Sequence, residues 1–486
     1  MRNTQSILPF KVELSPESGN VTAHAGLPLI VECIRAIIGK RFYRKLRDAL
    51  GYRSWKVVRR HLDSLVMLIV AGGECLDDLA TLRADSGLCR LVGFKPTSPT
   101  QAKDFLYRFH QAADGRLLTA ADDERLSVRG KARIRSDGPG LRALEGMVSE
   151  VVRRLQALHP RHTATLDVDA TIIEAVKKQA LKAYEGTIGY QPQMAWWAEQ
   201  GVWVCDEFRD GNVPAEFRMK QYLERAFGML PGSVKRRRLR GDSALYNEDA
   251  LTWADEQNIE FAVSADMSDS LLGKCRAIAD EHWKPYRSLK NDLEGHKQHE
   301  ERQWAEVCDF VPEWKRNRKK NGEPFVYIAI RVRSRQRDLL EPDENRWRYY
   351  AVVTNMDWDG ERLLRWHREK QGTVEHGHGV VKGQLAGGTL PCGRFGANAA
   401  WWRINVLCHN LLEFMKLETL PDGMRNMWPK GLRFRLFNVP GLLVSKGRQL
   451  VLRISQRHPI SETYVAARQA LATLVQRMRA SPLPAV

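Results

Sequence analysis

The sequence predicts a multi-domain α/β protein in which an all-helical N-terminal domain precedes an α/β core. Three observations predict this class. The chain has 486 residues, more than one hydrophobic core usually supports. Helical periodicity runs from about Leu27 to Phe109, and from His162 onward short β-like runs alternate with amphipathic segments. Hydrophobic residues make up 43% and charged residues 28% of the chain, a composition typical of folded globular proteins.

The first region, residues 1–135, is predicted to be a helical domain with basic surfaces. Cations such as Lys56, Arg59 and Arg60 lie on helices whose other faces are apolar. Ser98 and Gln101 have the spacing of a capping box, which predicts a helix that begins near this point. The cations either lie on a solvated face or contact DNA, and their positions alone leave both interpretations open.

A turn-rich break at residues 135–140 separates this region from the core, and a helix is predicted over about 141–158. We assign residues 160–265 to the first part of an α/β core, because strands and helices alternate there and suit a mixed sheet flanked by helices. The predicted elements are strands at 163–169 and 201–205, a helix at 214–230, a strand at 234–241, a helix at 247–257 and a strand at 259–263.

The second half of the chain begins with a charged, irregular segment. Residues 266–360 contain two strongly β-like runs, 325–332 and 347–354, and are interpreted as a β-rich insertion. The core is expected to resume over 361–416, with helices at 361–381 and 399–416 on either side of a glycine-rich loop. Residues 417–486 form a basic C-terminal region with a β-like stretch at 432–454 and a frayed tail from 480.

The charge balance indicates a polyanionic partner. Lys and Arg number 76 against 58 Asp and Glu, which gives a net charge of +18. Such a field attracts DNA or RNA and releases counterions from it. We expect no membrane partner, because the longest clean apolar run, residues 65–71, is far shorter than the roughly 20 residues that cross a bilayer. The absence of an apolar signal core predicts cytoplasmic residence, and the eight scattered cysteines are expected to be reduced.

Aspartates stand where two predicted core strands end. Asp167 and Asp169 point to the same face of the first strand, because side chains alternate along a strand. Asp242 follows the strand at 234–241 and precedes a helix, and α/β sheets build their sites at such strand ends. A lone aspartate in this position more often caps a turn, so each residue alone is unspecific.

A further carboxylate lies on the helix predicted over 361–381. Steps of three, four and seven residues place four polar side chains near one stripe of that helix: Arg368, Gln371, Glu375 and Lys382. A lone surface glutamate is usually solvated, so the case for chemistry depends on the ordered set of two aspartates and one glutamate. His376 and His378 are not expected to form a zinc site, because a His-x-His pair on a helix points its side chains apart.

At these residues the sequence resembles the DDE transposases of bacterial insertion sequences. It is similar to the group whose third acidic residue lies in a Tyr-x-x-Arg-x-x-x-Glu-x-x-x-x-x-x-Lys helix, and within that group to the thirteen-eighty family of insertion sequences. The resemblance spans most of the chain. It depends on the segments Leu166–Thr171, Arg240–Ser243, Gly372–Glu375 and Phe434–Gly441.

The resemblance implies that the core is ribonuclease-H-like, with the β-rich insertion before its last catalytic helix. It makes Asp169, Asp242 and Glu375 the catalytic and metal-binding residues, with Asp167 as the alternative to Asp169. The ions implied are two Mg²⁺ per active site, with Mn²⁺ as a substitute, because hard cations prefer oxygen ligands.

The resemblance also implies residues that contact DNA. Lys382 matches the signature at the correct spacing, whereas Arg368 stands at the Tyr position and Gln371 at the Arg position. A basic run lies directly before Asp242 and is expected to hold phosphates: Lys235, Arg236, Arg237, Arg238 and Arg240. A second basic run, residues 315–320, lies in the insertion and is either a phosphate contact or a solvated loop.

The function implied is a transposase that cuts the ends of its own insertion sequence and joins them to target DNA. Its partners would be double-stranded DNA, namely terminal inverted repeats and target, and a second copy of the chain in the DNA complex. The helical N-terminal domain would bind the DNA ends, and the protein would act at the bacterial nucleoid. Two alternatives remain, a metal-dependent nuclease of the same fold and a domesticated, inactive DNA-binding derivative.

Overall fold

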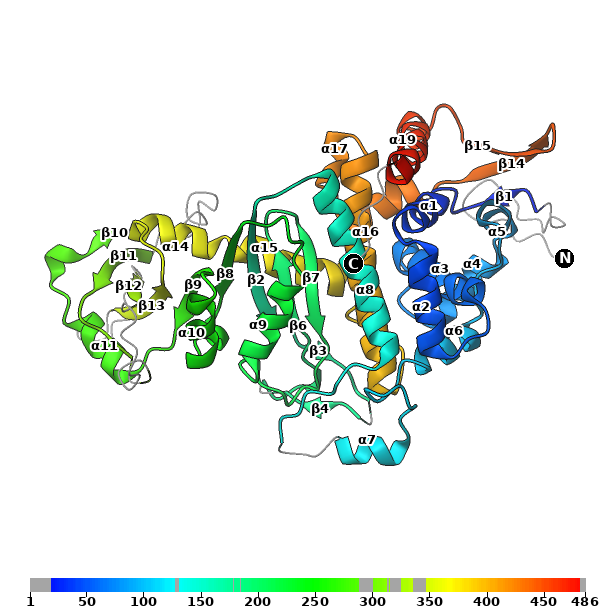
Figure 1. The fold of residues 1–486 in the computed structure, drawn as a ribbon. Helices are drawn as coiled ribbons and strands as arrows, with labels where there is room; N and C mark the ends of the chain where they lie inside the picture. The colour runs from blue at the N-terminus through cyan, green and yellow to red at the C-terminus, as the bar shows by residue number, and fades with distance from the viewer. Residues whose placement is uncertain are drawn as a thin grey trace, which may run out of the picture.

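The computed structural model describes residues 19–126, 131–177, 179–183, 185–287, 300–312, 314, 325–334 and 347–480. Helices from the N-terminal third lie beside a central mixed sheet, and the sheet continues outward into the strands of the predicted insertion (Figure 1). The C-terminal elements return to the N-terminal helices, so that segments from both halves of the sequence lie side by side.

The periodic segment of the N-terminal region forms helices, but strand β1 (Val21–Thr22) departs from the prediction of an all-helical domain. The capping box before α6 is confirmed, because the Ser98 and Gln101 side chains each accept a hydrogen bond from the other residue's backbone N–H, at 3.3 Å in both cases. The α-helices described before the core are α1 (Leu27–Ile37), α2 (Lys40–Leu50), α3 (Trp55–Ala71), α4 (Leu79–Ala84), α5 (Ser86–Val92), α6 (Pro99–Tyr107), α7 (Ala120–Leu126) and α8 (Pro139–Leu158).

The central sheet has the strand order β10-β11-β12-β13-β9-β8-β2-β6-β7. Strand β2 pairs in parallel with β8, and β8 with β9, whereas the remaining neighbours are antiparallel. The strands described in the predicted insertion therefore extend the core sheet beyond β9. The bounds are β2 (Thr163–Ala170), β6 (Gln193–Trp197), β7 (Val202–Glu207), β8 (Arg236–Gly241), β9 (Glu260–Ala265), β10 (Lys284–Pro285), β11 (Glu300–Val307), β12 (Val326–Ser334) and β13 (Arg348–Thr354).

Helices connect and cover these strands. The packing contacts place α8 and α16 against β7, α15 against β2 and β6, and α10 against β9. A small sheet of order β3-β5-β4 follows β2. The remaining core elements are β3 (Ile173–Glu174), β4 (Leu181–Lys182), β5 (Ile188–Tyr190), α9 (Met219–Gly228), α10 (Glu248–Glu256), α11 (Asp269–Arg276), α14 (Gly360–Arg368), α15 (Lys370–Gly379), the π-helical η5 (Val380–Gln384) and α16 (Phe395–Thr419).

The single helix predicted over 361–381 is divided into α14, α15 and η5. At the first junction the guanidinium of Arg240 donates a hydrogen bond of 2.6 Å to the carbonyl oxygen of Trp366. In an uninterrupted helix this oxygen accepts from the backbone N–H four residues later, which belongs to Lys370. A side chain from β8 therefore occupies the acceptor at which the helix is divided.

The C-terminal region differs from the prediction of a β-like stretch over 432–454. Its first part is helical, in α18 (Pro429–Leu432) and the π-helical η6 (Arg433–Phe437), because Leu432, Leu436 and Phe437 are buried on one side of a helical segment. Strands follow only later. The other elements are α17 (Asp422–Arg425), β14 (Gly441–Lys446), β15 (Gln449–Arg453) and α19 (Ser461–Ala480), and β14 pairs with β1 (Val21–Thr22).

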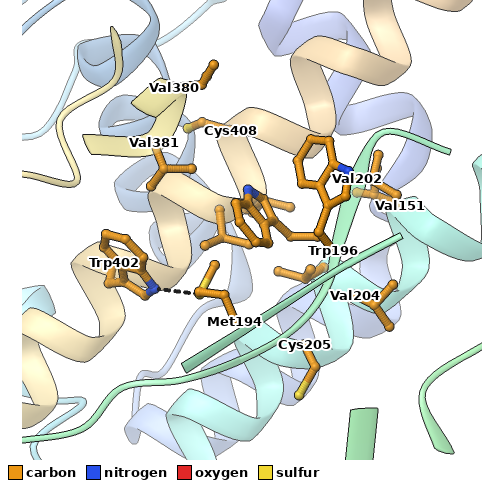
Figure 2. Packing of buried hydrophobic residues seen from close by; sticks show 14 of the residues in the cluster. Val151, Met194, Trp196, Val202, Val204, Cys205, Val380, Val381, Trp402 and Cys408 are labelled. Carbon is orange, nitrogen blue, oxygen red and sulfur yellow. Dashed lines mark hydrogen bonds between the residues drawn. The ribbon is translucent and has the colours of Figure 1, made fainter. Parts of the chain in front are cut away.

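Helix α16 is buried along most of its length where it packs against the sheet and the N-terminal helices. Figure 2 shows Met194 of β6 facing Trp402 of α16, and Trp196 of the same strand belongs to the same buried cluster. The indole N–H of Trp402 lies 3.4 Å from the sulfur of Met194. Burial of these large side chains on both elements fixes the position of the strands that lead to the candidate site.

All eight cysteines are free, as expected. Within the described residues, no helix is both long and apolar enough to cross a membrane. Of the tail predicted from residue 480, Ala480 belongs to α19 and the rest lies outside the described residues, as does the basic run at 315–320.

Candidate active site

Asp169 and Asp242 lie at the same end of two neighbouring parallel strands. The register of β2 and β8 pairs Val168 with Gly241. The next residue along the chain is an aspartate in both cases, Asp169 after Val168 and Asp242 after Gly241. Asp242 also caps the turn that follows, because its side chain accepts a hydrogen bond of 3.0 Å from the backbone N–H of Ala244. Both aspartates line an open cavity of about 950 Å³, and Lys382 lies in its wall.

Glu375 lies on the exposed side of α15, which packs against β2. It is outside the lining of the cavity, but its charge acts on Asp169. Burial raises the pKa of Asp169 to about 6, Lys370 opposes this increase, and the negative charges of Asp242 and Glu375 add to it. The three predicted acids thus share one electrostatic environment, although no three His, Cys, Asp or Glu side chains of the described chain already converge on one metal position.

Asp167 has a different environment from Asp169, although both point to the same face of β2. Its side chain is fully buried and both carboxylate oxygens accept from Arg240, at 2.6 Å from Nε and 2.9 Å from Nη2. The hydroxyl of Thr373 donates to the same carboxylate. Burial raises the pKa of Asp167, and the Arg240 charge opposes that increase.

Arg240 is a correction to the predicted phosphate contacts. Arg240 is 1% exposed. Its guanidinium donates hydrogen bonds within the protein to the carboxylates of Asp167 and Glu369 and to the carbonyl oxygen of Trp366. The burial has a simple cause, since β8 enters the sheet and its last residues lie in the core. Arg240 is therefore unavailable to DNA.

The rest of the basic run is graded in exposure. Lys235 and Arg236 are exposed, and Arg237 is half-buried with a hydrogen bond to the carbonyl of Gln257. Arg238 forms an ion pair of 2.6 Å with Glu260 and stacks over Trp358. The start of the run is thus the part that remains open to an anionic partner.

The predicted stripe along one helix is only partly present, because the helix is divided. Lys382 donates hydrogen bonds to the Thr171 hydroxyl at 3.1 Å and to the Ile172 carbonyl at 2.7 Å, which ties η5 to the loop after β2. Gln371 is exposed on α15, whereas Arg368 belongs to α14 and its charge acts on Tyr286 of the outer sheet. Neither of these two residues lines the cavity.

The two histidines on α15 point apart, as predicted. His376 is exposed and lies against Trp428, with 4.6 Å between the ring centroids. His378 is buried beside Trp203, and its Nε2 lies 3.9 Å from a carboxylate oxygen of Asp169. Burial, together with the charges of Lys382 and Lys370, lowers the pKa of His378 to about 3, so its ring is neutral next to the cavity.

Four acidic residues of the cavity escaped the sequence analysis, namely Glu174, Glu185, Glu216 and Asp266. Asp266 follows β9 directly and lines the same cavity as Asp169 and Asp242. The available signal was its position immediately after a buried strand, the same signal that singled out Asp242. Its neighbour β9 is parallel to β8, so three consecutive strand ends carry a carboxylate.

Comparison with known proteins identifies the family. Residues 5–476 match the family described as "Transposase DDE domain group 1". A search of curated proteins finds no match. Among solved structures, the chain is similar to one titled "Cryo-EM structure of piggyBac transposase synaptic complex with hairpin DNA (SNHP)", with 10% sequence identity, a TM-score of 0.43, and coverage of 94% of this chain and 82% of that chain. Because the family match covers nearly the whole sequence, this protein belongs to the DDE transposases, enzymes that cut and join DNA.

Proposed function

We propose that Asp169, Asp242 and Glu375 are the catalytic residues of this transposase. The observation that carries the proposal is the placement of Asp169 and Asp242 at adjacent parallel strand ends in the wall of one open cavity, with the Glu375 charge acting on Asp169. Open cavities at such strand ends are where α/β sheets bind their ligands. The cavity is the place where we expect the scissile phosphate to bind.

The first acid of the set is Asp169 in this proposal. Asp167 is the weaker candidate, because both of its oxygens are occupied by Arg240 and it is 0% exposed. Removing Arg240 from that carboxylate would leave a buried charge without a partner, which is costly. Asp169 instead lines the cavity and keeps a carboxylate oxygen free for a ligand.

The residues fit a divalent metal, which DDE transposases use. The donors are carboxylate oxygens, the ligands that Mg²⁺ and Mn²⁺ prefer, and a cation would relieve the repulsion that Asp242 and Glu375 exert on Asp169. Two ions held by Asp169, Asp242 and Glu375 would supply Lewis-acid stabilisation of both the attacking and the leaving oxygen during phosphoryl transfer.

Cationic and polar residues in and around the cavity are proposed to contact the DNA. Lys382 uses two of its three N–H donors on the loop after β2, which leaves one donor for a phosphate oxygen. Lys235 and Arg236, which are exposed at the start of β8, are proposed as further phosphate contacts. Gln371 and Arg368 are retained as DNA contacts outside the cavity.

The core is proposed to be ribonuclease-H-like. Support comes from the strand order around β2. On one side β6 pairs antiparallel with β2, and β7 pairs antiparallel with β6. On the other side β8 is parallel to β2, and β9 is parallel to β8. We further propose that the substrates are the double-stranded terminal inverted repeats of a bacterial insertion sequence of the thirteen-eighty type and its target DNA, bound by a dimer of this chain.

A strand-transfer assay tests the proposal. The full chain is incubated with Mg²⁺, target DNA and DNA carrying the inverted repeats that flank its coding sequence. We expect cleavage and joining, and we expect Asp169→Asn, Asp242→Ala and Glu375→Ala each to lower both by at least about 100-fold, since each removes charge stabilisation from the transition state. Glu216→Ala changes an exposed acid of the same cavity outside the proposed set and serves as the matched control.

The outcomes separate the alternatives. Full activity in the Asp242 or Glu375 variant refutes the assignment of the site. Cleavage without joining favours the metal-dependent nuclease, and DNA binding without either reaction favours an inactive derivative.

A further inference from the structure

A surface of mixed aromatic and cationic side chains lies beside the helix that carries Glu375. It is formed by α17, α18 and η6, and we name it the 425–435 surface. Its exposed members are Arg425, Trp428, Lys430, Phe434 and Arg435. Phe434 is 83% exposed and Trp428 is 46% exposed, which is unusual for side chains with such large apolar rings.

Phe434 is held in this exposed position by its own helical turn. Leu436 and Phe437, which follow it in η6, are at most 1% exposed, so the opposite side of the turn is fixed in the core. Arg433 donates hydrogen bonds to the carbonyls of Val70 and Gln384, at 3.1 and 2.9 Å. The ring is therefore presented on a rigid element.

The 425–435 surface adjoins the candidate active site. The Trp428 ring packs edge-on against His376, with 4.6 Å between centroids, and His376 follows Glu375 on the exposed side of α15. Gln384, which accepts from Arg433, ends the η5 turn that carries Lys382. A DNA strand bound at the cavity would therefore lie next to the 425–435 surface, because Trp428 contacts His376, the residue that follows Glu375.

The composition of the surface favours nucleic acid over protein as its occupant. Trp428 and Phe434 are the large exposed hydrophobics of residues 425–435, and the other exposed side chains there are Arg425, Asn426, Lys430 and Arg435. Lys430 and Arg435 form no ion pair with any acid in the described part of the chain, whereas Arg425 pairs with Asp422 at 2.9 Å. Aromatic faces among unpaired cations are the pattern that binds single-stranded nucleic acid, where bases stack and cations contact phosphates.

We propose that the 425–435 surface binds unpaired DNA bases next to the active site, with Phe434 and Trp428 stacking on bases and Lys430 and Arg435 contacting phosphates. The inference depends on the membership of the chain among DNA-cutting enzymes, and it is independent of which acids bind metal. Strands that separate at a cut would find a stacking site there.

The test measures binding of the full chain to two fluorescent probes in EDTA, oligothymidylate of 20 residues and an abasic strand of the same length. We expect Phe434→Ala to weaken oligothymidylate binding by about ten-fold while abasic binding is unchanged, because one base–aromatic stack contributes about 1–3 kcal/mol. Phe434→Tyr should retain the affinity. The double variant Lys430→Ala/Arg435→Ala should weaken both probes and reduce the salt dependence, because each lost phosphate contact lowers the slope by about 0.7.

Leu450→Ala is the matched control, since Leu450 is an exposed apolar residue on β15 outside the 425–435 surface. Wild-type oligothymidylate binding by Phe434→Ala and by Trp428→Ala/Phe434→Ala would overturn the proposal. So would a change from dimer to monomer in light scattering with unchanged DNA affinity, because the surface would then be a contact between copies. Both measurements omit divalent metal, so they are unaffected by a failure of the triad assignment.

Discussion

Two aspartates separated by one residue show how local environment divides the roles of identical side chains. Asp167 and Asp169 lie on the same face of β2, yet Asp167 forms a buried ion pair with Arg240 while Asp169 lines the cavity. The alternation of side chains along a strand predicts that the two aspartates share a face, and it cannot predict that their environments differ. The partner of Asp167 comes from a strand 73 residues later, and its burial depends on the packing of α14 and α15 above it.

The ion pair makes a prediction about stability. Arg240→Ala leaves a buried carboxylate unpaired, so the free energy of unfolding should fall by about 3–5 kcal/mol, whereas Asp242→Ala removes only a turn cap and should lower it by about 0.5–2 kcal/mol. Arg240→Lys should recover only part of the loss, because an ammonium cannot form the two parallel hydrogen bonds of a guanidinium. Urea unfolding followed by circular dichroism measures all three. If Asp167→Ala abolishes strand transfer at unchanged stability, Asp167 returns as the first catalytic acid.

At the scale of single elements, local signals predict what local contacts determine. The start of α6 follows from the Ser98–Gln101 capping box, and α16 from its long apolar pattern. The sequence predicts a β-like stretch over 432–454, yet residues 433–437 form η6 because Arg433, Leu436 and Phe437 are held by α3, η5 and the core. The order of strands in the sheet, which brings Asp169 beside Asp242, arises from long-range pairing.

The position of α15 depends on a close approach to β6 and β7. A Cβ atom at Gly377 would lie 2.6 Å from the ring of Trp203 and 2.8 Å from that of Trp196, too close for either buried indole to accommodate without movement. Glycine at this position therefore allows α15 to pack closely against the sheet. This packing determines the position of Glu375 relative to Asp169, because Glu375 lies two residues earlier on the other side of the same helix.

Gly377→Ala should consequently impair both stability and catalysis. We expect a loss of about 1–3 kcal/mol in the free energy of unfolding from overpacking, and a larger fall in strand-transfer rate than in DNA affinity because Glu375 is displaced. Gly372→Ala is the control on the same helix, where a Cβ meets nothing within 4 Å and alanine favours the helix by up to about 1 kcal/mol. Equal effects of the two substitutions would contradict the conclusion that Gly377 is needed for close packing of α15 against the sheet.

At the scale of the whole molecule, the N-terminal helices and the core sheet share one hydrophobic cluster. Helix α16 contacts α1, α3, α6 and α8 as well as β7, and β1 pairs with β14. The turn-rich break at residues 135–140 predicts a domain boundary. It carries no information on packing, because a helix from the second half of the chain completes the core of the first, and only tertiary contacts determine that.

This continuity predicts that the N-terminal helices and the sheet unfold as one cooperative unit. The backbones of the two regions meet at Gly396, where a Cβ would lie 2.5 Å from the carbonyl oxygen of Phe109 and 2.6 Å from the Cα of His110. Gly396→Ala should therefore force α16 away from α6 and lower the opening free energy of both regions by a similar amount, about 1–3 kcal/mol. Native-state hydrogen exchange of the slowest amides in α3 and β6 measures the two values separately.

Gly228→Ala, on α9 with open space around its Cβ, should leave both protection factors unchanged. Faster exchange in α3 alone would mean that the N-terminal helices form an independent folding unit attached to the catalytic core. Because both regions pack against α16, we expect the two opening free energies to fall together. DNA held by the N-terminal helices would then be connected to the catalytic strands through a continuous core instead of a flexible linker.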